Sequence, residues 1–199
     1  MTTSVLDLVN LSLLRLGQST ITDLAAEDST SKVCNLNHQQ AIDWVLRERS
    51  WKFNTTRIDL TSPGLTPAFG WNFSYPLPLA HLCTLEVRTT SLKDYQENHT
   101  LYAQEVGAIL TDGDNGVKLK YLRRVDPSLI PSHVVDVIAL NLALRIAIPI
   151  TGSKELHGTL TSEYATYLSQ AAALDGLQGN NTVIRSSVLI RARVAGVVF

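Results

Sequence analysis

The chain has 199 residues, enough for one substantial hydrophobic core or for a core with a small subdomain. Its formal net charge of -1 argues against a strongly basic nucleic-acid-binding protein, and two cysteines without a CxxC spacing argue against a disulfide scaffold. Hydrophobic residues make up 45% and charged residues only 18%, which suggests that other subunits cover part of the surface.

The first expected helix spans residues 3–17. It is apolar on nearly every side, and Gly17 stands where a residue just past a helix C-terminus is expected. A helix of this kind must be covered on nearly all sides, either by a neighbouring protomer or by the other helices of its own chain.

A second helix is predicted from an N-cap at residues 28–30 to about Ser50, with Asp43 and Arg47 as an i,i+4 ion pair. Its apolar residues fall along one stripe. This stripe comprises Leu36, Ala41, Trp44, Val45 and Trp51.

Residues 52–125 have the alternating, β-branched pattern of strands. Strands are expected at 52–60, 71–75, 82–89, 106–111 and 117–124, separated by proline- and glycine-containing breaks. Asn115–Gly116 is a strong hairpin signal and predicts that the last two of these strands pair with each other.

Helical patterns return after residue 126. A third helix is expected at about 132–148, apolar on most sides and ended by Pro149, Thr151 and Gly152. Residues 134–150 include Asp136, Asn141 and Arg145, so they make a poor membrane span and no membrane partner is expected. A fourth helix is expected from 153 to about 177. One face of it carries Leu160, Tyr164, Tyr167, Leu168, Ala171 and Leu174.

This order of elements predicts an α+β fold. Residues 1–51 and 126–178 form an antiparallel helical bundle, residues 52–125 form an inserted small antiparallel β domain, and residues 179–199 form an extended C-terminal tail. The two nearly all-apolar helices, the first and the third, are the expected faces between subunits. The predicted subunit-interface residues are Leu8, Leu11, Val135, Ile138 and Leu142.

The C-terminal tail is apolar and basic and has no carboxylate side chain. It could be the last strand of the β domain, but docking onto a partner, by strand addition or in a groove, is favoured because a free β-branched tail invites aggregation. The predicted docking residues are Val183, Ile184, Arg185, Val188, Leu189, Ile190, Arg191, Arg193, Val194, Val197, Val198 and Phe199.

Catalytic chemistry finds little support. The five histidines have no metal-ligand spacing, and no phosphate-binding loop or GxSxG motif occurs, so no metal, cofactor or catalytic residue is predicted. Residues 112–116 only faintly resemble a calcium loop, and a turn explains them. Cys34 and His38 could pair as thiolate and base, although a buried structural cysteine is commoner.

The motifs in chain order resemble a known family. They are Leu-Arg-Leu-Gly at 14–17, Val-Leu-Arg-Glu-Arg-Ser-Trp-Lys-Phe at 45–53, Phe-Ser-Tyr-Pro-Leu-Pro at 73–78, Lys-Tyr-Leu-Arg-Arg-Val-Asp at 120–126, and the run from 140 to 153. Together they resemble tail tubular protein A, the head-to-tail adaptor of short-tailed, podovirus-type bacteriophages.

The resemblance implies a structural virion protein of the tail, assembled in the host cytoplasm as a homo-oligomeric ring, a dodecamer in this family. The ring would bind the portal protein above and the nozzle protein (tail tubular protein B) below, and double-stranded DNA would pass through it non-specifically. The tail would reach toward the portal. Two alternatives stay open: a cell-wall or polysaccharide hydrolase, and an oligomeric scaffold unrelated to phages.

Overall fold

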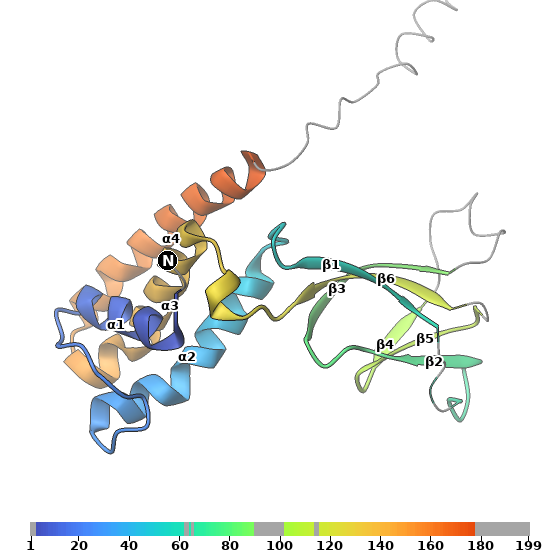
Figure 1. The fold of residues 1–199 in the computed structure, drawn as a ribbon, viewed down its shortest axis with the longest axis horizontal. Helices are drawn as coiled ribbons and strands as arrows, with labels where there is room; N and C mark the ends of the chain where they lie inside the picture. The colour runs from blue at the N-terminus through green and yellow to red at the C-terminus, as the bar shows by residue number, and fades with distance from the viewer. Residues whose placement is uncertain (1–2, 62–63, 65, 90–101, 114–115, 178–199) are drawn as a thin grey trace, which may run out of the picture.

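The residues that the structure describes form four α-helices and two small antiparallel β-sheets, so the expected mixed α/β content is confirmed. The computed structural model describes residues 3–61, 64, 66–89, 102–113 and 116–177. Figure 1 shows the helices on one side of the molecule and the strands on the other. The predicted docking tail lies outside the described residues.

The N-terminal helices begin at side-chain caps. Helix α1 spans Val5–Arg15, and Ser4 accepts a hydrogen bond from the Asp7 backbone N–H at 3.1 Å while donating its own N–H to the Asp7 carboxylate at 2.9 Å. These bonds lower the pKa of Asp7. Helix α2 spans Ser29–Glu48 and begins at Asp28, whose side chain accepts from the Ser31 N–H. Both helices therefore start where local capping chemistry predicts.

Helix α3, Ser132–Thr151, is the central element of the helical part, because α1, α2 and α4 (Lys154–Leu177) all pack against it. It continues past the expected end at 148 and carries Pro149 within its last turn, ending at Gly152 with a φ of +69°. By length and composition α3 could cross a membrane, but 61% of its apolar window is buried in the protein. It has the properties of a core helix.

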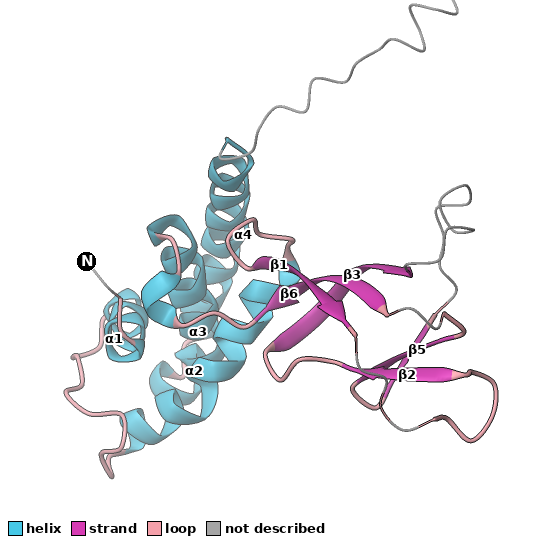
Figure 2. Cartoon of the chain, turned by 45° about the vertical axis from the view of Figure 1, so that its right-hand side comes forward, coloured by secondary structure: helices cyan, strands magenta, loops and turns pink. Residues whose placement is uncertain are grey.

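In its described residues the β part forms two three-stranded sheets. The first has the order β1 (Thr55–Leu60), β6 (Val117–Arg123), β3 (His81–Thr89), and the second has the order β2 (Phe73–Pro76), β5 (Ala108–Thr111), β4 (Ala103–Glu105). All neighbouring strands are antiparallel (Figure 2). Side chains from both sheets, including Tyr75, Ile109, Leu119 and Tyr121, share one buried cluster, so the sheets pack face to face.

The predicted hairpin at Asn115–Gly116 is wrong, because β5 and β6 belong to different sheets. Gly116 still needs to be glycine: its φ is +83°, and a Cβ there would lie 3.0 Å from the Leu60 carbonyl oxygen. The tight hairpin joins β4 to β5 instead. Its two-residue turn is Val106–Gly107, with φ values of +42° and +75°.

Hydrogen bonds fix the β part to the helices where the chain crosses between them. Trp51 is buried and donates its Nε1–H to the Val45 carbonyl at 2.8 Å. The Lys52 N–H donates to the Asp175 carboxylate near the end of α4, at 3.2 Å from Oδ2. At the return crossing, the short 3-10 helix Pro127–Leu129 follows β6. The first crossing segment is therefore held to α2 and α4 by specific hydrogen bonds.

Candidate protein-docking surface

Four of the five predicted subunit-interface residues belong to the chain's own core. Leu8, Val135, Ile138 and Leu142 are at most 5% exposed and pack against other helices of the same chain. They present no surface to a second subunit, so the interface prediction is corrected for them. Leu11 is the exception, with 38% of its surface exposed.

Exposed apolar side chains also occur on the other helices: Leu174 and Leu177 on α4 are 47% and 81% exposed, and further ones lie on α2 and α3. Leu36 is 74% and Trp44 55% exposed, and Ile148 on α3 is 49% exposed. The stripe predicted for α2 is therefore wrong at Leu36 and Trp44. The buried face of α2 is formed by Ser31, Cys34, Ala41, Ile42, Val45 and Leu46, which point to the opposite side of the helix.

The two helices run antiparallel. The C-terminal half of α2 packs with the N-terminal half of α3 in one core cluster, and Cys34 and Ala41 pack with the second half of α3 in another. Leu36 and Ile148 therefore lie toward the same end of the helix pair. We call the surface formed by Leu36, Gln40, Trp44, Arg145 and Ile148 the Trp44 face.

Arg145 holds the centre of this face in place. Its Nε donates to the Asn141 Oδ1 at 2.9 Å, and its guanidinium carbon lies 5.7 Å from the centre of the Trp44 ring. One Nη also reaches Gln40 on α2 at 3.5 Å. A cation over an indole, fixed by an amide behind it, is a preorganised pair, and Trp and Arg are the residue types most enriched at binding hot spots.

Polar groups form the rim of a groove of about 670 Å³ beside Trp44. Glu48 accepts a hydrogen bond from the Tyr164 hydroxyl, and burial together with this bond raises the pKa of Tyr164. Asp43 binds Arg124 through both carboxylate oxygens, with 2.8 Å between Nε and Oδ1, and this contact raises the pKa of Arg124. The ion-pair partner of Asp43 is therefore Arg124, which is distant in sequence, and not the predicted Arg47.

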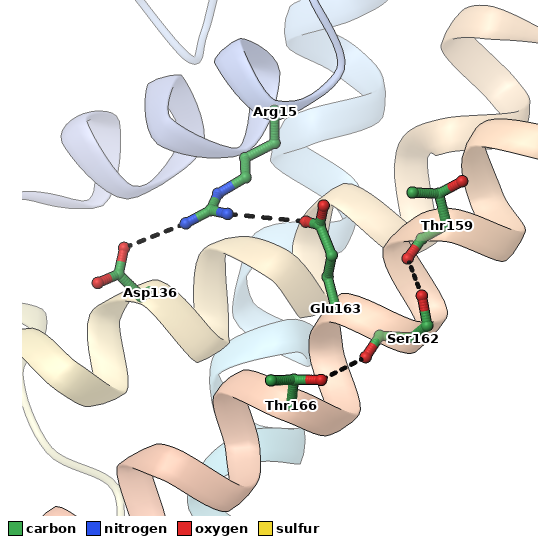
Figure 3. Close-up of polar contacts among 6 residues, drawn as sticks. All are labelled: Arg15, Asp136, Thr159, Ser162, Glu163 and Thr166. Atoms are coloured by element: carbon green, nitrogen blue, oxygen red, sulfur yellow. Dashed lines mark hydrogen bonds and ion pairs between the residues drawn. The ribbon is translucent and has the colours of Figure 1, made fainter.

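Helix α1 offers a second, smaller apolar surface. Leu11 and Leu14 lie one turn apart and are 38% and 59% exposed. Arg15, at the end of α1, connects this helix to the rest of the helical part: its guanidinium lies 3.4 Å from Asp136 on α3 and 3.8 Å from Glu163 on α4 (Figure 3). It also lies over the Tyr167 ring. The exposed leucines therefore stand on a helix whose end is fixed.

The candidate catalytic pair receives no support from the geometry. Cys34 is fully buried, and this burial raises the pKa of its thiol to about 11, which disfavours the thiolate that a nucleophile needs. Within the described residues no group of three or more His, Cys, Asp or Glu could hold a metal ion. Asp112, in the calcium-like segment, instead accepts a hydrogen bond from the Asn72 N–H at 3.1 Å.

No protein-family model matches the chain, and no curated protein shows significant similarity to it.

Proposed function

We propose that this chain is a ring-forming structural subunit of a short-tailed phage, the adaptor between the portal and the tail nozzle. In this proposal the helices form an antiparallel bundle, residues 52–125 are an inserted β domain, and residues 179–199 are the extended tail that docks on the portal. The order of two helices, strands and two helices supports it, as does the series of motifs that resembles tail tubular protein A.

The Trp44 face is the observation that carries the proposal. A closed ring of identical subunits needs two different complementary faces on each subunit. Among the described residues, the Trp44 face on α2 and α3 and the Leu11–Leu14 pair on α1 are candidates for these two faces. We propose that a neighbouring copy of the chain covers the Trp44 face. Burial of a Trp–Arg centre within a polar rim is the arrangement typical of stable interfaces.

One observation favours the hydrolase alternative: the groove beside Trp44 contains two carboxylates, Asp43 and Glu48, next to an aromatic ring. A glycosidase needs one carboxyl group to donate a proton and the other to act as nucleophile or base. Here Asp43 accepts hydrogen bonds from Arg124 and Gln39, and Glu48 accepts one from the Tyr164 hydroxyl. Carboxylates that are held by partners within the chain are typical of the polar rim of an interface and less suited to proton transfer. Docking is therefore the better-supported function.

The proposal is tested with the portal protein of the phage that it implies. The full-length protein should co-sediment with assembled portal, and a variant lacking residues 183–199 should lose this binding while keeping its helical content. Full binding by the truncated variant would contradict the proposed role of the tail. For the alternative, release of reducing sugar by pure protein that is abolished in both Glu48→Gln and Asp43→Asn would favour hydrolysis.

A further inference from the structure

The outer face of the first sheet carries a continuous band of positive charge. Strand β1 contributes Arg57 and Asp59 to this face, β6 contributes Lys118 and Lys120, and β3 contributes Glu86 and Arg88. The alternate residues of the same strands, among them Ile58 and Leu119, pack toward the second sheet. The six charged side chains therefore share the face directed away from the core.

The strand register arranges these charges in two rows across the sheet. Arg57 lies beside Lys120, which lies beside Glu86, and Asp59 lies beside Lys118, which lies beside Arg88. The four cations are thus contiguous, running diagonally from Arg57 through Lys120 and Lys118 to Arg88. The two acids occupy the two remaining corners. The face carries an excess of positive charge, although the whole chain has a net charge of -1.

This band places like charges opposite one another. Arg57 faces Lys120 and Arg88 faces Lys118 directly across neighbouring strands, and such pairs destabilise a sheet. Arg88 forms an ion pair with Glu86. Within the part of the chain that the structure describes, the other three cations form no ion pair closer than 4.0 Å. An anionic ligand along the band would relieve both repulsive contacts.

We infer that this band contacts the phosphate backbone of double-stranded DNA, independently of base sequence. Lys118 and Lys120 are two residues apart on one strand, about 6.7 Å, a separation comparable to that of successive phosphates along a nucleic-acid strand. Among the described residues no aromatic side chain lines this groove, so base stacking of the kind that holds single strands is not provided. Four of the six charged residues, two lysines and two carboxylates, are of types depleted from the centres of protein–protein interfaces, whereas Arg57 and Arg88 are of a type enriched there.

The inference deepens the proposed function, because an adaptor that surrounds the DNA path needs weak contacts that allow sliding. Affinity for duplex DNA rises with the number of phosphates that are neutralised. Two acids among the four cations reduce the net positive charge of the band, and the binding is therefore expected to be weak. A surface made only of lysine and arginine would hold the DNA in place.

The test measures binding of the full-length protein to a fluorescein-labelled duplex of about 30 base pairs by anisotropy, between about 50 mM and about 200 mM salt. The Lys118→Gln/Lys120→Gln variant removes two charges from the band. A matched control, Lys32→Gln/Lys154→Gln, removes two charges from the helical part. Both double variants keep the C-terminal arginines, so any contribution of the tail is the same in all three proteins.

The band variant should bind roughly 50-fold more weakly than the unmodified protein at about 0.1 M salt, and the magnitude of its log–log salt slope should fall by about 1.8. The control should stay within about threefold. Equal weakening in both variants, absence of duplex binding at about 50 mM salt, or stronger competition by polyglutamate than by unlabelled duplex of equal charge would overturn the inference. Polyglutamate preference would indicate an acidic protein partner.

Measuring ring assembly of the band variant distinguishes a failure of this inference from a failure of the proposed function. The band variant should still form rings and bind the portal, because the band lies on the β part, away from the Trp44 face. Duplex binding through the band by a protein that never assembles would leave the inference standing and contradict the proposed function. Normal rings of the band variant that bind DNA as tightly as the unmodified protein would contradict the inference and leave the proposed function standing.

Discussion

Replacing Trp44 with alanine should weaken contact between subunits far more than it destabilises the single subunit. A tryptophan side chain can bury roughly 250 Å², so the exposed 55% of Trp44 corresponds to roughly 140 Å² available for an interface. At about 25 cal/mol per Å², covering it contributes about 3.5 kcal/mol to each subunit contact. The expected loss of affinity is more than about a hundredfold.

The fold of the variant should survive, because Trp44 lies outside the core clusters of α2 and α3. Within the chain its ring contacts the guanidinium of Arg145, and this cation–π pair contributes about 1 kcal/mol. Sedimentation velocity at a series of protein concentrations measures assembly, and circular dichroism on heating measures the stability of the subunit.

Phe69→Ala is the matched control, since Phe69 is 90% exposed but lies in the loop before β2. This variant should assemble like the unmodified protein. The reasoning is refuted if Trp44→Ala assembles at the same concentration as the unmodified protein, or if Phe69→Ala impairs assembly equally.

Two further predictions concern stability. Val106→Asn should stabilise the protein by about 1 kcal/mol in urea unfolding, because a β-branched residue is strained at a φ of +42° and asparagine suits the first position of this turn; a decrease would contradict that account. Burial raises the pKa of Cys34 to about 11 from an ordinary 9.0, so the folded state holds this proton more tightly and the thiol's contribution is lost as pH rises from about 9 to about 11. Cys34→Ala should lose stability less steeply over that range, and identical slopes would count against the pKa shift.

Local chemistry could be predicted from the sequence. The N-cap at Asp28 and the glycines that end α1 and α3 depend on a few neighbouring residues, and these three predictions are confirmed. The hairpin at Asn115–Gly116 failed for a related reason. A turn signal reports the local backbone conformation but not which sheet each flanking strand joins. The hairpin that does form was missed because valine is a poor residue for its turn.

Exposure and long-range pairing could not be predicted in this way. Leu36 and Trp44 are apolar, but their angular position on α2 places them away from the face that packs on α3. Helix α3 is apolar on most sides, which predicted that a neighbouring subunit covers it. Instead, α1, α2 and α4 of the same chain pack against it. Asp43 pairs with Arg124 across 81 positions of sequence, and only the folded chain brings these two residues together. The Trp44 face therefore became apparent only from the structure.

The most direct test of the central claim is electron microscopy of the purified protein mixed with the portal protein of the proposed phage. The account predicts closed rings of this chain stacked coaxially on the portal, with the α2–α3 surface of each subunit covered by its neighbour. Particles that remain single subunits at every ratio of the two proteins, with the portal unoccupied, would contradict it.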